Sequence, residues 1–203
     1  QTRWFQKAYD YGIGLRIGRH IEAHNIRLSA GLDHEWGQAN ARQNTASLMA
    51  EKVFPQIKQG KPLFFVVIDN LRLDQWEVIK PLVSEYFNTS EESTYFSILP
   101  TTTAFARNAL FSGMMPSDMA RFHPELWEGE DTDEGKNNHE EDFLSENLHR
   151  NKLNIKFSYN KILQVYQGKA VLDHFHQLLN NDLNVLVYNF VDMMSHARTD
   201  IKM

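Results

Sequence analysis

The sequence predicts an α/β fold, a three-layer α/β/α domain around a mostly parallel sheet, and three observations lead to this prediction. Residues 63–68, Leu-Phe-Phe-Val-Val-Ile, are apolar throughout, which is typical of a central parallel strand buried on both faces. Helical spacing follows over residues 76–87. Strand-like and helical segments then alternate, and this pattern favours parallel strands, right-handed crossovers and helices on both faces of the sheet.

The other elements are predicted in chain order from hydrophobic spacing and stop signals. A short helix is expected within residues 44–58, followed by a turn over residues 59–62. After the helix over 76–87, the pattern predicts a strand over 95–99, a helix over 103–112 ending at Gly113, a solvated acidic loop from residue 128, a helix from Glu140, a strand over 155–159, a helix over 171–179 and a strand over 184–191.

We expect two parts in the chain, an N-terminal segment over residues 1–57 and the α/β domain over residues 58–203. The N-terminal segment is expected to be helical, although its apolar residues fit both a helical and an alternating strand pattern. The sequence ends at Met203, shortly after the last predicted strand, so we expect a domain that is incomplete at its C-terminus.

Composition narrows the class of protein. Of 203 residues, 21 are Lys or Arg and 26 are Asp or Glu, so the net charge of −5 gives no electrostatic reason to bind nucleic acid or anionic membranes nonspecifically. Cysteine is absent, which excludes disulfides and thiolate zinc sites. No apolar run is long enough to cross a bilayer. We therefore expect a cytoplasmic protein without a membrane partner.

Three predicted strand ends carry side chains suited to chemistry: Asp69, Thr103 and Asp192. Ligands of open α/β sheets bind outside the carboxyl ends of the strands, so these residues are expected on one rim. His196 follows Asp192 by four residues, and a carboxylate and an imidazole at this spacing can bind one divalent cation.

Each of these residues also has a plainer interpretation. Asp192 can cap a helix and leave His196 exposed at the surface. Thr103 can be a helix N-cap, a position for which Thr101 and Thr102 compete. The rim itself suits cleavage of a phosphate ester. A helix N-terminus favours a phosphoryl group, and a divalent metal makes a nearby hydroxyl a usable nucleophile.

Three stretches resemble the PglZ domain, a branch of the alkaline phosphatase superfamily. They are Val-Val-Ile-Asp-Asn-Leu-Arg-Leu-Asp-Gln-Trp at residues 66–76, Ile-Leu-Pro-Thr-Thr-Thr at residues 98–103 with its continuation to Gly113, and Tyr-Asn-Phe-Val-Asp-Met-Met-Ser-His-Ala-Arg-Thr at residues 188–199. The resemblance extends over roughly residues 50–203. It is closest to the PglZ domains of PorX-type response regulators of the type IX secretion system.

This resemblance implies an alkaline phosphatase-like fold and a phosphohydrolase with two divalent metal ions, expected to be Zn²⁺. By position, Asp69 and Thr103 would bind one metal, with Thr103 also the catalytic nucleophile. Asp192 and His196 would bind the other. The family pattern requires further ligands after these, and none follows within the sequence, which again predicts C-terminal truncation.

The group that supports the phosphoryl oxygens is left open. In related nucleotide phosphodiesterases an Asn stands three residues after the nucleophile, where this chain has Ala106. Arg107, Asn108 and Asn70 are the alternatives.

The resulting expectation is a zinc-dependent phosphodiesterase acting on nucleotides or oligonucleotides, the output domain of a PorX-like two-component response regulator. Its expected partners are the phosphodiester substrate, regulatory proteins and a second copy in a homodimer. The rival expectations are a noncatalytic metal-containing module that binds signalling proteins, and a phosphomonoesterase or phosphotransferase on the same rim. Turnover separates the binding module from the enzymes, whereas metal binding does not.

Overall fold

The structure is a computed structural model that describes residues 43–98, 101–127 and 137–189. The chain divides into two compact units. The first comprises Gln1–Met49 and Tyr95–Asn147, and the second comprises Ala50–Thr94 and Leu148–Met203. The predictions made for the N-terminal residues 1–42, and for Asp192 and His196, lie outside the described residues.

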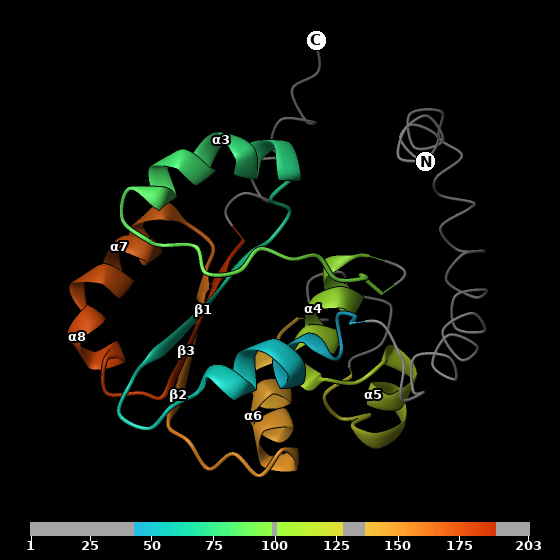
Figure 1. Cartoon of the computed structure of the whole chain (residues 1–203). Coiled ribbons are helices and arrows are strands. Elements are labelled where there is room, and N and C mark those ends of the chain that lie inside the picture. The colour runs from blue at the N-terminus through green and yellow to red at the C-terminus, as the bar shows by residue number, and fades with distance from the viewer. Residues whose placement is uncertain (1–42, 99–100, 128–136, 190–203) are drawn as a thin grey trace, which may run out of the picture. The chain divides into compact units, whose positions relative to one another are not determined.

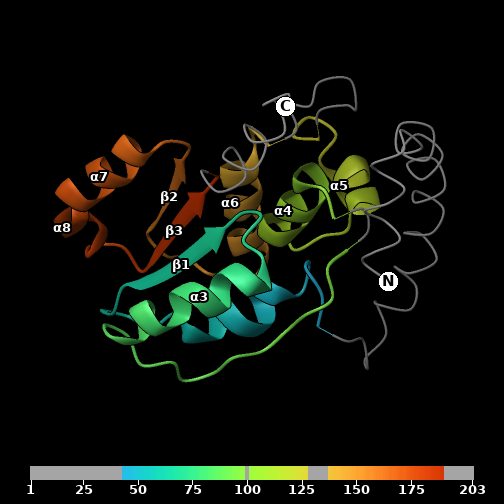
Figure 2. The same ribbon diagram turned by 90° about the horizontal axis from the view of Figure 1, so that it is seen from above.

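The second unit contains a parallel sheet of three strands, β1 (Leu63–Ile68), β2 (Phe157–Ile162) and β3 (Leu183–Tyr188), in the order β1-β3-β2. Figure 2 shows the strands side by side and pointing the same way. Their ends are level, since Ile68 and Ile162 both pair with Tyr188. The predicted α/β class and parallel sheet are confirmed, and β1 has the predicted bounds.

The central strand of the described sheet is β3, and the prediction that β1 takes this place is wrong for the described residues. Leu183, Val185 and Val187 of β3 have no exposed surface. Val66 of β1 is 47% exposed, and β1 has a strand on one side alone within the described part of the sheet. An uninterrupted apolar run therefore identified a parallel strand correctly but did not fix its place in the order.

The connection from β2 to β3 consists of α7 (Val165–Asp173) and α8 (Phe175–Leu178), which lie on one face of the sheet (Figure 1). The ring of Phe175 stacks on that of Phe64 in β1, with centroids 5.3 Å apart. The sequence predicted one helix over 171–179. It begins earlier because the Gln167 side chain accepts hydrogen bonds from the backbone N–H groups of Leu163 and Gln164. The strand β2 was predicted over 155–159, and the observed strand, Phe157–Ile162, begins two residues later.

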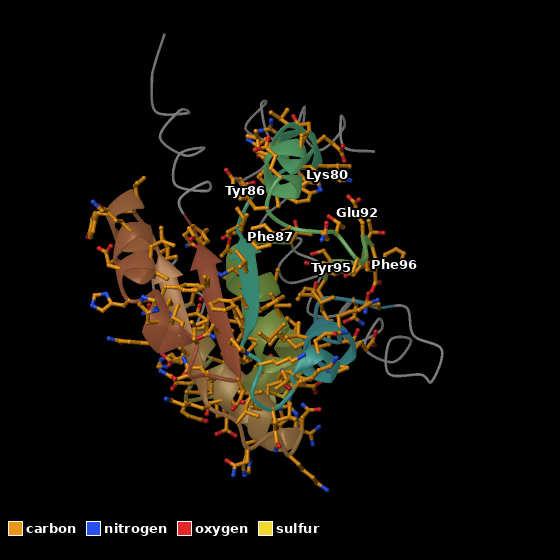
Figure 3. The ribbon with its side chains drawn as sticks, turned by 60° about the vertical axis from the view of Figure 1, so that its left-hand side comes forward. Lys80, Tyr86, Phe87, Glu92, Tyr95 and Phe96 are labelled. Carbon is orange, nitrogen blue, oxygen red and sulfur yellow. The ribbon has the colours of Figure 1, made fainter. Side chains whose placement is uncertain are left out.

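The helix after β1 is α3 (Leu73–Ser84), which begins near the carboxyl end of β1 (Figure 1). The helix is confirmed, but none of its residues is buried, which is less packing than its amphipathic pattern predicted. The segment after α3 is attached to it by Glu92, which accepts hydrogen bonds from Lys80 Nζ at 2.5 Å and Trp76 Nε1 at 3.3 Å. Figure 3 shows Lys80 and Glu92 facing each other, with Tyr86 and Phe87 near the end of the helix.

The predicted strand over 95–99 is not a strand of the sheet. In the described part of this segment, Phe96 forms an isolated bridge with Asn44. The Phe96 N–H donates to Gln43 O, its carbonyl accepts from Thr45 N–H, and Ile98 N–H donates to Thr45 Oγ1. The backbone groups of Phe96 and the N–H of Ile98 are therefore paired with residues 43–45 of the same unit.

The remaining elements are short helices. Residues 44–58, predicted as one helix, contain the π-helix η1 (Met49–Val53) and the 3₁₀-helix η2 (Phe54–Gln56), whereas α4 (Thr103–Ser112) has the predicted bounds and α6 (Glu140–Arg150) begins where predicted. The helix α5 (Pro116–Phe122) was not predicted. Phe111, Met119 and Phe143, from α4, α5 and α6, have no exposed surface and form part of the first unit's core. Within the described residues, no helix has both the length and the apolar character of a membrane span.

Candidate active site

Asp69 directly follows β1 at the carboxyl edge of the sheet. Its N–H donates to the carbonyl of Tyr188 at 3.0 Å, so the hydrogen-bond ladder between β1 and β3 continues one residue past the strand. Its neighbour along this edge is Asn189, whose N–H donates to the carbonyl of Ile162 at 3.0 Å. The hydrogen bonds of the sheet hold the Asp69 backbone in place, and the half-buried Asp69 side chain is attached to this fixed backbone.

Asn70 turns the chain sharply after Asp69. Its φ of 60° lies in the left-handed region, which Asn tolerates better than most residues. The turn leads to Arg72, the N-cap of α3, whose guanidinium pairs with the Asp74 carboxylate at 2.8 and 2.9 Å. The hydrogen bonds from Arg72 lower the pKa of Asp74 below its usual value. Asp69 is thus followed by a left-handed turn at Asn70 and by a helix whose first turn carries the Arg72–Asp74 ion pair.

Thr103 is the first residue of α4, and the N-cap position belongs to Thr102. The carbonyl of Thr102 accepts the N–H groups of Phe105 at 3.1 Å and Ala106 at 2.9 Å. The alternative that Thr103 is the helix cap is therefore wrong. The Thr103 side chain lies in the first turn, half-buried, where the positive end of the helix dipole favours negative charge.

Two of the three alternatives for the group that supports the phosphoryl oxygens are engaged inside the first unit. Arg107 is 4% exposed and binds Glu140 through two hydrogen bonds of 2.6 and 2.5 Å. Asn108 is 1% exposed, and its Nδ2 donates to the carbonyl of Ala104 at 2.9 Å. Asn70 is the exposed one of the three. Burial therefore favours Asn70 for a role toward a ligand.

The four predicted metal ligands are not placed relative to one another in the described residues. Asp69 belongs to the second unit and Thr103 to the first, and Asp192 and His196 lie outside the described residues. In the ranges that the structure describes, no group of three or more His, Asp or Glu side chains could hold a metal ion. That the four residues share one rim stays a prediction.

Comparison with known proteins decides the family. A family profile described as the BREX system PglZ alkaline phosphatase-like domain matches residues 48–203. This chain belongs to the PglZ family. The matched range contains all four predicted metal ligands of this PglZ domain, and its α/β sheet and helices agree with an alkaline phosphatase-like fold. No curated protein matches the chain.

Proposed function

We propose that this PglZ domain belongs to a metal-dependent phosphodiesterase that cleaves nucleotides or oligonucleotides, and that it is the output domain of a PorX-like response regulator. The observation that carries the proposal is the family match over residues 48–203, together with Asp69 fixed at the carboxyl end of β1. Open α/β sheets bind their ligands outside this edge. A cytoplasmic location, regulatory protein partners and a homodimer belong to the same proposal.

The residues proposed to hold two divalent ions, Zn²⁺ by expectation, are Asp69 and Thr103 for one and Asp192 and His196 for the other. The donor types fit, because zinc binds carboxylate oxygen and imidazole nitrogen. The half-buried Asp69 carboxylate is supported by a backbone that the sheet holds in place. When bound, such ions stabilise the charge that develops on the phosphoryl oxygens.

The chain's own contribution begins with the Thr103 hydroxyl, the proposed nucleophile. Its place in the first turn of α4 puts it where backbone dipoles favour an anionic phosphoryl group. α4 ends at Gly113 in a left-handed turn, and the buried Arg107 ties its middle to α6. These contacts fix the position of the helix that carries Thr103 within the first unit.

The experiment that tests the proposal is a hydrolysis assay on the whole protein. Zinc-dependent hydrolysis of bis-p-nitrophenyl phosphate and of a short oligonucleotide is compared for the unmodified protein, Thr103→Ala and the control Thr101→Ala. Thr101 is an exposed threonine two residues before the helix. We expect Thr103→Ala to lower kcat by at least about a hundredfold and Thr101→Ala to leave it nearly unchanged.

Other results lead to other conclusions. Two zinc ions bound per chain without hydrolysis of either substrate would favour the noncatalytic binding module. Hydrolysis of the monoester p-nitrophenyl phosphate, assayed in parallel, without hydrolysis of either diester would favour a phosphomonoesterase. Equal activity of Thr103→Ala and the unmodified protein would remove Thr103 as the nucleophile.

A further inference from the structure

A cavity of about 250 Å³ lies in the second unit between β2 and the helices α7 and α8. One wall is Asn160 in the middle of β2, and the helices supply the rest. The lining residues are Asn160, Ala170, Val171, His174, Gln177 and Leu178. Three lining residues are apolar and three are polar, so the cavity can both contact a small molecule and orient it by hydrogen bonds.

The exposed imidazole of His174 lines this cavity, and its hydrogen bonding defines which ring nitrogen carries a proton. Its Nδ1 lies 2.9 Å from the carbonyl oxygen of Ala170, the residue one helical turn before it. A carbonyl oxygen only accepts hydrogen bonds, so Nδ1 must carry the proton. In the neutral ring, Nε2 is then an acceptor and is available to a ligand N–H group.

Two carboxamides complete the polar half of the cavity. Asn160 Nδ2 is 3.5 Å from Ser158 Oγ, a weak contact that leaves its oxygen without a partner among the described residues. The Gln177 side chain has no hydrogen bond to any other described residue. Its backbone N–H donates to the carbonyl of His174 at 2.9 Å. Together the three side chains offer both donors and acceptors, and no Lys, Arg, Asp or Glu lines the described cavity.

From this lining we infer that the cavity binds one small, uncharged, planar ring that carries adjacent hydrogen-bond donors and acceptors, the chemical class of a nucleobase or a lactam. Neutral ligands are favoured, because no Lys, Arg, Asp or Glu lines the cavity to pair with a charged one. The volume allows one ring and not a nucleotide with its phosphates.

The proposed site is independent of the phosphoesterase proposal. Asn160 lies within β2, two residues before the strand ends at Ile162. The cavity lies on the face of the sheet that carries α7 and α8. Asp69, in contrast, follows the end of β1. Failure of either proposal leaves the other untouched, because the cavity is tested by ligand binding to this chain and the phosphoesterase proposal by hydrolysis.

The experiment is a titration of the ¹⁵N-labelled chain, residues 1–203, followed by NMR through the side-chain NH₂ resonances of Asn160 and Gln177. The probes are uracil and nicotinamide, with benzoate and inorganic phosphate as charged comparisons. We expect saturable shifts of both resonances with at least one neutral probe. The charged probes should leave them in place.

Variants then test the residues. Gln177→Leu and His174→Phe each keep most of the side-chain volume and remove one hydrogen-bonding group, so each should weaken binding about three- to tenfold. His176→Phe is the matched control, since His176 is an exposed histidine on α8 outside the lining. The inference is overturned if no neutral probe saturates, if benzoate or phosphate binds equally well, or if His176→Phe weakens binding as much as His174→Phe.

Discussion

Arg107 and Glu140 form a buried ion pair between α4 and the first residue of α6, with side chains 5% and 1% exposed. The geometry is bidentate, Nε to Oε1 at 2.6 Å and Nη2 to Oε2 at 2.5 Å. Such a fork matches both carboxylate oxygens, which a lysine could not do. The pair therefore fixes the helix that carries Thr103 and is not itself a ligand-binding group.

Breaking this pair should destabilise the chain strongly. Glu140→Ala leaves the Arg107 guanidinium buried without its carboxylate, so we expect the free energy of unfolding to fall by about 3–5 kcal/mol. Urea unfolding followed by circular dichroism measures the change. Glu141→Ala, at the exposed neighbour, is the control and should change it by less than about 0.5 kcal/mol. Equal effects of the two variants would mean that the pair is not formed in solution.

The C-terminus of α4 gives a second prediction, because two glycines with similar backbones differ in their surroundings. Gly60 and Gly113 have φ of 73° and 64°. A Cβ at Gly113 would lie 2.9 Å from the Asn147 side chain, whereas one at Gly60 would meet nothing within 4 Å. Asn147 cannot move without losing its 2.9 Å hydrogen bond to the Phe111 carbonyl.

We therefore expect Gly60→Ala to cost about 1 kcal/mol, the strain of a left-handed alanine. Gly113→Ala should cost about 2–4 kcal/mol, since the displaced hydrogen bond adds to the same backbone strain. Thermal and urea unfolding of both variants measure the difference. If the two costs are equal, the contact with Asn147 contributes nothing and backbone strain alone acts at both positions.

The sequence predicted elements well where the signal was local. The apolar run of β1 and the helical spacing of α4 with Gly113 after it predicted the observed bounds of both. The segment over 95–98 failed, because its partners are residues 43–45, about fifty residues earlier. Apolar residues there suggested a strand of the sheet. Which backbone groups their N–H and C=O groups bind depends on the tertiary fold, which the local sequence does not determine.

The candidate site divides in the same way. The place of Asp69 followed directly from the run that precedes it, and the structure has it at the strand end. The role of Arg107 could not be predicted, because Glu140 is 33 residues away and nothing local links the two. A polar residue in a helix next to a proposed nucleophile therefore suggested a ligand-binding group where the structure has an internal ion pair.

A pH-dependent change is expected at the segment that follows α3. Lys80 lowers the pKa of Glu92 below its usual value of 4.5 by hydrogen bonding, with a second hydrogen bond from Trp76. A carboxylate whose folded pKa is lowered contributes stability above its unfolded pKa and loses it as the pH falls through the folded pKa. The attachment of this segment should thus persist at neutral pH and loosen only below pH 4.5.

The Trp76 side chain reports this change. The chain contains four tryptophans, so 5-fluorotryptophan labelling with ¹⁹F NMR gives four resonances, and Trp76→Phe identifies the one required. We expect it to shift reversibly with a midpoint below pH 4.5, and Glu92→Gln to abolish that titration. A midpoint above this value, or an unchanged titration in Glu92→Gln, would show that Glu92 does not hold the segment.

Asn70 gives the last prediction, which rests on the proposed phosphoesterase function. The effects of its left-handed φ of 60° and of its side-chain amide can be measured separately. Glycine adopts the same φ without strain and lacks the amide. Asn70→Gly should fold with nearly unchanged stability and lower kcat/KM at least about tenfold if the amide supports the phosphoryl oxygens. Asn70→Ala should lose the same activity and also about 1 kcal/mol of stability. Full activity of Asn70→Gly with reduced activity of Asn70→Ala would instead assign Asn70 the sole task of turning the backbone after Asp69.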